Sequence, residues 1–279
     1  MPPYDIPVHN IEENVFMLPI EKGHRYNLNG THSHNFYEIL YFTQVGEDSM
    51  HEIDFVQFPI KTEYIYLIKP GQVYRMNFTV EQGYLIAVKS EYFNHIRMHF
   101  KEHIGYKLHN RICIESKDTE SVKQIIEVLF KETSESRRNE LINAYLHTLV
   151  TFMMLSHHMN TGMNYIDSRI SDVISLVEKF YQSEHETSFY AAKISLGNKR
   201  LNALAKQELG MTVKQLIQER LILEAKRRIS YGKETFKSIA FGLGFKDTSY
   251  FSRFFKQHTG QTPEDFKSSV IYDLHSTKD

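Results

Sequence analysis

Three side chains with the chemistry of metal ligands lie close together in the segment Gly30-x-His32-x-His34-x3-Glu38. Alternate residues of a β-strand point to one face, so His32, His34 and Glu38 could converge there. Imidazole and carboxylate groups bind Zn²⁺, but a closed zinc site takes four ligands and three would leave its shell incomplete. We therefore expect no metal, and we interpret the three residues as hydrogen-bonding groups at the mouth of a β-barrel.

No other pattern in the chain indicates catalysis. There is no Ser/His/Asp order, no glycine-rich phosphate loop and no Cys/His pair, and Cys113 is the single cysteine. We expect neither enzymatic activity nor a cofactor. The chain has no run of 18 apolar residues, and its first ten residues lack the apolar core of a secretory signal. These features favour a cytoplasmic protein without a membrane partner.

The charge is unevenly distributed along the chain. The net charge is −1, yet residues 190–256 hold 14 basic and 5 acidic residues. The first 164 residues hold 15 basic and 20 acidic residues. A basic block in an otherwise acidic chain is the electrostatic pattern of a protein that binds a polyanion. A solvated helical surface is the alternative interpretation, because charge alone does not separate the two.

Two segments within this basic block share one design, a short helix, a tight turn and a second helix with a basic outer face. The first turn covers 194–197 and precedes an expected helix over 198–208. The second turn is made by Gly244-Phe245 and precedes an expected helix over 248–259. The inward stripes at helical spacing are Leu201, Leu204 and Ala205, then Phe251, Phe254 and Phe255. This is the helix-turn-helix arrangement, whose second helix can lie in a major groove.

The second segment closely resembles the C-terminal signature of the AraC/XylS family of bacterial transcription regulators. The matching residues are Ile239-Ala-x3-Gly244-Phe245-x3-Ser249-Tyr250-Phe251-x-Arg253-x-Phe255-Lys256-x3-Gly260-x-Thr262-Pro263. The match continues upstream through Leu201-x7-Leu209-Gly210 and Arg220-Leu221-x2-Ala225-Lys226. The resemblance covers 170–268.

The resemblance implies two helix-turn-helix units joined by one long helix, here 213–230. At ~1.5 Å per residue this helix spans roughly 26 Å, which suits two recognition helices in successive major grooves of double-stranded DNA. By position, the base-reading residues are Lys199, Asn202, Thr248, Ser249, Ser252 and Arg253. We expect Lys206, Lys246 and Lys256 to contact phosphates, which adds affinity without specificity.

The first unit departs from the family pattern at three positions. Gly197 replaces the usual Ser that caps the helix, and Ala203 and Ala205 replace a common Arg and Phe. We therefore expect the second unit to contribute more base readout than the first.

The front of the chain is rich in short apolar and aromatic runs, which predict strands over 34–41, 64–68, 72–78 and 84–89. The motif around His32 resembles the first half of the pattern of metal-binding cupin barrels. That pattern would place another His soon after the turn at Pro70-Gly71, where Tyr74 occurs instead. The family resemblance implies a cupin-like barrel with a ligand pocket. The candidate pocket residues are His32, His34, Glu38, Tyr41, Tyr66 and Tyr74, and each of the aromatic ones could equally be plain core.

Helical spacing begins after Ser121 and predicts helices through 122–130 and 141–153. Their apolar stripes would either cover the barrel or form a homodimer. A polar stretch at 156–164 favours a linker. The predicted fold is therefore α+β with two domains: a cupin-like barrel with flanking helices over 1–160, and an all-α domain with two helix-turn-helix units over 165–271.

Three functional hypotheses follow. The first is a transcription activator whose front domain senses a small-molecule effector and dimerises; such an activator would also contact RNA polymerase. The second is a regulator whose front domain only dimerises. The third is a metallo-cupin enzyme joined to a DNA-binding domain, against which Tyr74 counts.

Overall fold

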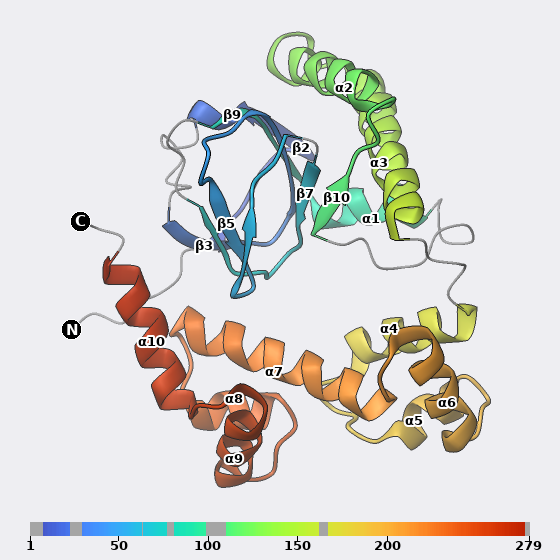
Figure 1. Ribbon diagram of the computed structural model, residues 1–279, viewed down its shortest axis with the longest axis vertical. Coiled ribbons are helices and arrows are strands. Elements are labelled where there is room, and N and C mark those ends of the chain that lie inside the picture. Colours follow the sequence, from blue (N-terminus) through green and yellow to red (C-terminus); the bar gives the residue numbers. More distant parts are fainter. Residues whose placement is uncertain are drawn as a thin grey trace. The chain divides into compact units, whose positions relative to one another are not determined.

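The computed structural model describes residues 8–22, 30–62, 64–76, 81–98, 110–161 and 167–276. The chain divides into two compact units, which contain residues 7–164 and 165–279 (Figure 1). The first is rich in strands and the second is entirely helical, which confirms the predicted fold class. Among the described residues, no helix has the length and apolar character needed to cross a membrane.

The first unit is built from two five-stranded sheets, in the orders β1-β3-β8-β5-β6 and β10-β7-β4-β9-β2. All neighbours pair antiparallel except β1 and β3. The strands are β1 (Val8–His9), β2 (Val15–Pro19), β3 (Gly30–His34), β4 (Tyr37–Gln44), β5 (Met50–Ile53), β6 (Val56–Pro59), β7 (Tyr64–Ile68), β8 (Tyr74–Met76), β9 (Gln82–Val88) and β10 (Arg111–Cys113).

The two sheets share one core, because side chains from both pack in a single cluster. Leu40 of β4, Tyr66 of β7 and Leu85 of β9 meet Ile53 of β5 and Tyr74 of β8 there. All five side chains are at most 2% exposed. The inner faces of the sheets therefore form the closed interior that the sequence predicted for the front domain.

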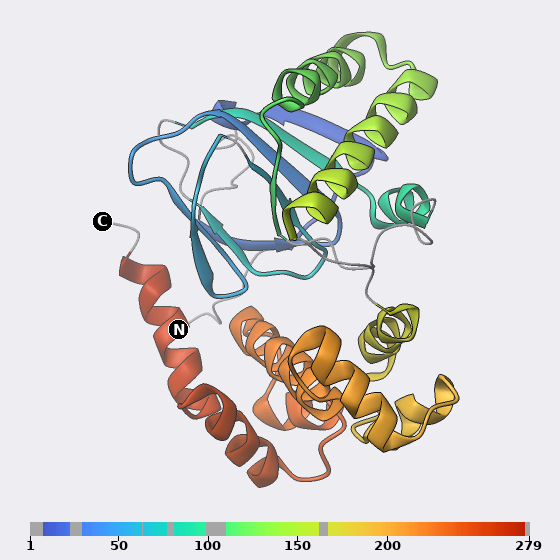
Figure 2. The same cartoon turned by 45° about the vertical axis from the view of Figure 1, so that its right-hand side comes forward.

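The helices of this unit cover the outer face of the sheet that contains β4. They are α1 (Ser90–Met98), α2 (Thr119–Lys131), the π-helix η2 (Glu132–Ser136) and α3 (Asn139–Thr161). Figure 2 shows α2 and α3 side by side against this sheet. Leu149 of α3 and Ile126 of α2 are fully buried in one cluster with Ile39 and Ile65. These stripes therefore cover the barrel, the first of the two predicted alternatives.

Two predictions for this unit were wrong. The expected strand over 34–41 is interrupted at Asn35-Phe36, and its two parts belong to different sheets. The expected linker at 156–164 is helical as far as Thr161, where α3 ends. Polar residues alone do not end a helix, and the first strong helix breaker after Phe152 is Gly162.

The second unit consists of seven described helices. They are α4 (Ser168–Phe180), α5 (Thr187–Lys193), α6 (Asn198–Leu209), α7 (Val213–Tyr231), α8 (Phe236–Gly242), α9 (Thr248–Thr259) and α10 (Pro263–Ser276). The long helix α7 lies between the α5–α6 pair and the α8–α9 pair (Figure 1).

Local capping fixes the ends of these helices. Thr212 and Gln215 form a capping box at the start of α7, and Gly232 ends α7 with φ 71°. The carboxylate of Asp247 accepts hydrogen bonds from two backbone N–H groups at the start of α9, and Gly260 ends that helix with φ 82°. Because these signals are local, the helix boundaries could be predicted within a few residues.

Candidate DNA interface and the polar cluster of the front unit

The α5–α6 and α8–α9 pairs turn in the same way. In the first turn the Leu196 N–H donates to the Ala191 carbonyl at 2.9 Å, and in the second the Phe245 N–H donates to the Ala240 carbonyl at 3.0 Å. One residue earlier, Ser195 has φ 55° and Gly244 has φ 80°. Both turns thus use a left-handed residue at one equivalent position. This repeat identifies two helix-turn-helix units of the same geometry.

The second recognition helix, α9, separates a buried aromatic stripe from a polar face. Phe251 and Phe255 are fully buried, while Ser249, Arg253 and Lys256 are exposed. The remaining two predicted readers, Thr248 and Ser252, are half-buried, and Lys246 in the preceding turn is exposed. Tyr250, which sequence reasoning left out, is 55% exposed. An exposed aromatic residue beside a predicted reader was the signal that could have identified it.

The first recognition helix, α6, also presents a polar and basic face. Lys199 and Lys206 are exposed, and so is Arg200, which the sequence prediction omitted. The Lys199-Arg200 pair at the start of a helix was the signal that could have included it. Asn202 is half-buried, and its side-chain oxygen accepts a hydrogen bond from the Val213 N–H at 3.1 Å. Its assignment to base reading stays a prediction, and it now competes with this structural role.

The basic residues of this unit divide into paired and unpaired groups. On α7, Lys214 pairs with Glu186, Arg220 with Glu178 and Glu224, and Arg228 with Glu234. Among the described residues, no ion pair involves the basic side chains of the recognition helices, which are Lys199, Arg200, Lys206, Arg253 and Lys256. Unpaired exposed cations are available to phosphates and base edges.

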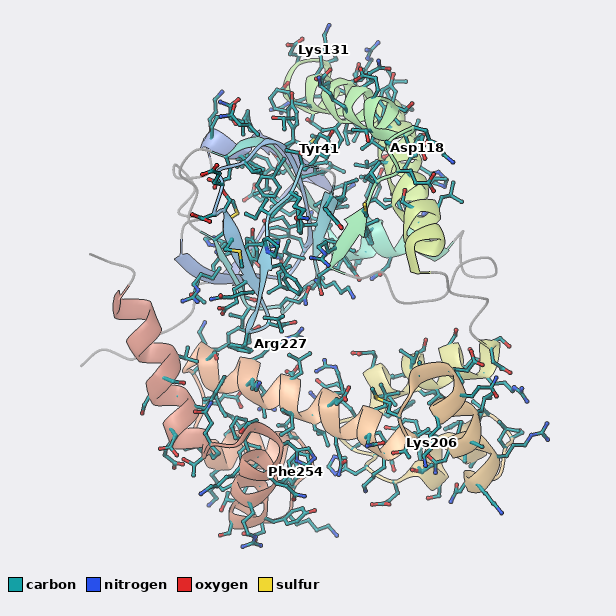
Figure 3. The ribbon with its side chains drawn as sticks, viewed as in Figure 1. Tyr41, Asp118, Lys131, Lys206, Arg227 and Phe254 are labelled. Atoms are coloured by element: carbon teal, nitrogen blue, oxygen red, sulfur yellow. The ribbon has the colours of Figure 1, made fainter. Side chains whose placement is uncertain are left out.

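The loop between α4 and α5 packs against the turn of the second helix-turn-helix unit and against α7. A side chain at Gly244 would place its Cβ 2.2 Å from the carbonyl oxygen of Gln182. The ring of His185 lies 5.6 Å from the ring of Phe245, and the ammonium group of Lys214 donates to the His185 carbonyl at 2.9 Å. Figure 3 shows Lys206 of α6 and Phe254 of α9 at opposite ends of α7. This loop and α7 therefore fix the separation of the recognition helices.

Polar side chains gather in the interior of the front unit. His32, His34, Glu38 and His51 are each at most 2% exposed. The His34 Nε2 lies 3.8 Å from the Glu38 carboxylate, and the Tyr74 hydroxyl lies 3.5 Å from the His51 Nδ1. The His32 ring lies 5.4 Å from the Tyr74 ring. Five predicted pocket residues, among them Tyr66, therefore share the barrel interior with His51, which the sequence reasoning missed.

Burial favours the neutral forms of Glu38, His34 and His51 near pH 7. It raises the pKa of the Glu38 carboxyl to about 8 and lowers the pKa of His34 to about 3 and that of His51 to about 4. The Glu38 Oε1, the His34 Nε2 and the His51 Nε2 are buried and have no hydrogen-bond partner among the residues that the structure describes. Buried polar atoms of this kind are costly unless a water or ligand satisfies them.

The prediction for Tyr41 needs a correction. Tyr41 belongs to the cluster between the sheet and the helices, whereas Glu38 points into the interior. Two residues of one strand that are three apart point to opposite faces, so strand alternation itself separates them. Among the described residues, no group of three or more His, Cys, Asp or Glu side chains has an arrangement that could hold a metal ion.

Comparison with known proteins links the helical unit to DNA-binding regulators. A helix-turn-helix domain family matches residues 190–269. The arabinose operon regulatory protein of Salmonella typhimurium is 30% identical over 104 residues, which cover 37% of this chain and 37% of that protein. The corresponding protein of Escherichia coli is 28% identical over 132 residues, covering 47% and 40%. The transcriptional activator RhaS of Klebsiella pneumoniae is 26% identical over 101 residues, covering 36% of each chain.

These matches thus span about two fifths or less of the relatives' length. Among solved structures, ToxT of Vibrio cholerae is similar, with a TM-score of 0.47 and 13% identity, covering 91% of this chain and 98% of ToxT.

Proposed function

We propose that this chain is by its C-terminal domain a member of the AraC/XylS family of transcriptional regulators, and that the whole protein is a sequence-specific activator. The observation that carries the proposal is the repeated helix-turn-helix geometry, with unpaired basic side chains on both recognition helices. In this role α6 and α9 enter successive major grooves on one side of the duplex. The function is binding, without an enzymatic step, and it takes place in the cytoplasm.

Each exposed group has a distinct role in this proposal. Arg253 reads a base, because a guanidinium can bond guanine bidentately through its O6 and N7. Lys206 and Lys256 bind phosphates, which strengthens binding to every sequence alike. We therefore expect Arg253→Ala to lower affinity for the preferred site by about 1–3 kcal/mol, and Lys206→Ala to reduce the slope of log affinity against log salt by about 1.

Selection of fragmented genomic DNA by the purified protein, with Arg253→Ala in parallel, tests the proposal. Wild-type protein should enrich a directional site, and the variant should lose preference at one base pair. If all fragments bind equally and only salt weakens the binding, the basic faces bind DNA electrostatically and without sequence preference. Transcription in vitro from the promoters next to the enriched sites, with and without the protein, would show whether RNA polymerase is recruited.

The barrel interior is the proposed effector site. The neutral state of Glu38 and His34 favours an uncharged ligand that offers hydroxyl or carbonyl groups, because an ion would lose its hydration without a countercharge. Such a ligand would shift the two units between conformations only as far as it prefers one of them. A thermal-shift screen of uncharged sugars and polyols tests this, with Glu38→Gln as the variant that should lose the response.

A front unit that serves only for dimerisation is the second candidate. It is favoured by the large aromatic side chains of Phe42, Tyr66 and Tyr74, which pack in the barrel core. If no small molecule raises the melting temperature at about millimolar concentration, the proposal that the front unit senses a ligand is wrong, and a role in dimerisation alone is favoured.

The homodimer remains a proposal under both candidates. Leu149 is fully buried against the barrel, so it does not report on an interface. Leu155 of α3 is 51% exposed and is the residue to test.

A further inference from the structure

A cavity of about 580 Å³ lies outside the barrel, between the start of β2 and the turn from α2 to α3. In Figure 3, Lys131 marks the end of α2 at which the cavity is found. Its lining combines the loop before β2, α1, the π-helix η2 and the first turn of α3. A cavity of this size can hold a small molecule.

The backbone at the edge of this cavity is irregular in two ways. Residues 132–136 form a π-helix, a rare conformation that often occurs at functional sites. Arg137, which follows it, has φ 52° in the left-handed region that favours glycine. The neighbouring Arg138 forms an ion pair with the buried carboxylate of Glu132, with the Arg138 Nε 2.9 Å from Glu132 Oε2. This pair fixes the turn and leaves Arg137 at the cavity.

The exposed rim of the cavity carries charges of both signs. Glu12 and Glu13 lie in the loop before β2, and Arg137 lies between η2 and α3. None of these three side chains takes part in an ion pair or side-chain hydrogen bond with the described residues, and the same is true of the Asn143 amide. Below them Ile142, which is buried, supplies an apolar wall.

We propose that this lateral cavity binds a zwitterionic molecule of the amino acid or short-peptide class. Arg137 binds the carboxylate, Glu12 and Glu13 bind the ammonium group, and the apolar side chain lies against Ile142. A charge-assisted contact at each end explains why both signs of charge face one cavity. The proposed effector site inside the barrel is separate, and this inference does not depend on it.

Isothermal titration of the full-length protein tests the proposal with four related probes. L-leucine and the dipeptide Gly-Leu carry both charges, 4-methylpentanoate lacks the ammonium group, and isopentylamine lacks the carboxylate. We expect L-leucine or Gly-Leu to bind at least about tenfold more tightly than either single-charge probe. If neither zwitterion binds at about 10 mM, or if a single-charge probe binds as tightly, the proposal is wrong.

Variants locate the binding on the protein. Arg137→Gly removes the cation and suits φ 52°, so it preserves the turn, and we expect about a 10- to 100-fold weaker affinity. Glu13→Gln should weaken binding by about tenfold, whereas Glu135→Gln, on the same π-helix but outside the cavity lining, should leave it unchanged. Glu38→Gln inside the barrel should also leave it unchanged. Binding that survives Arg137→Gly, or that Glu135→Gln weakens equally, would overturn the assignment.

Discussion

The turn of the second helix-turn-helix unit offers a stringent test, because its left-handed position is held by Gly244 whereas Ser195 holds that position in the first unit. Gly244→Ala should strongly destabilise the helical unit. An Ala at φ 80° costs about 1–2 kcal/mol, and a Cβ 2.2 Å from the Gln182 carbonyl oxygen forces the backbone apart, which adds about 1–3 kcal/mol. The sum is about 2–5 kcal/mol. For a domain of this size that corresponds to a fall in melting temperature of roughly 10–20 °C.

The matched control is the equivalent residue of the first turn. Ser195 also lies in the left-handed region, so Ser195→Gly relieves strain and should raise stability by up to about 1 kcal/mol. Thermal unfolding followed by helical circular dichroism measures both variants, and DNA binding is measured below the transition. The reasoning is refuted if Gly244→Ala unfolds within about 2 °C of wild type, or if Ser195→Gly unfolds at a clearly lower temperature.

Three further predictions concern Glu38, Asn202 and Leu155. Since Glu38 has a pKa of about 8 in the folded protein and 4.5 as its ordinary value, only the unfolded chain ionises between these pH values, and stability falls as pH rises. In urea unfolding, the free energy of unfolding of Glu38→Gln minus that of wild type should increase by about 3–5 kcal/mol between pH 4.5 and pH 8. A difference that does not increase with pH would contradict a buried protonated carboxyl. Asn202→Ala removes the hydrogen bond to the Val213 N–H and should cost about 1 kcal/mol of stability in a denaturant titration; changed base preference without a stability loss would restore Asn202 as a reader. Leu155→Glu should give a folded monomer by sedimentation, whereas Leu149→Glu should unfold the front unit; a dimeric Leu155→Glu protein would place the interface elsewhere.

Much of the helical unit could be predicted from sequence because its signals are local. Thr212 with Gln215, Asp247 and the glycines at 232 and 260 mark helix ends by their own chemistry. The buried stripe of α9 likewise follows from the spacing of its aromatic residues.

The front unit was harder to predict, and one reason is that the β5–β6 hairpin lacks the usual turn residues. The hairpin of β5 and β6 turns through Asp54 and Phe55, both with positive φ, where Asn-Gly or Gly is the common signal. The turn is held instead by distant partners, since Asp54 accepts from the Val73 N–H at 3.2 Å and from the side chain of Gln72. The sequence around Asp54 does not predict these contacts with Gln72 and Val73.

The candidate sites show the same limit. Alternation along one expected strand predicted that Glu38 shares a face with His32 and His34, but His51 joins them only because β5 pairs with β8. The lateral cavity combines residues more than 100 positions apart in the chain, such as Glu13 and Arg137. Proximity of that kind depends on the tertiary fold.

The most direct test of the central claim is a chemical-interference footprint on the preferred DNA site. We expect two major-groove contact patches on one face of the duplex, about 10 base pairs apart, because α7 spans ~28 Å between α6 and α9. Arg253→Ala should remove contacts within one patch and leave the other intact. A single patch, or two patches that Arg253→Ala weakens equally, would contradict an interface built from two separate recognition helices.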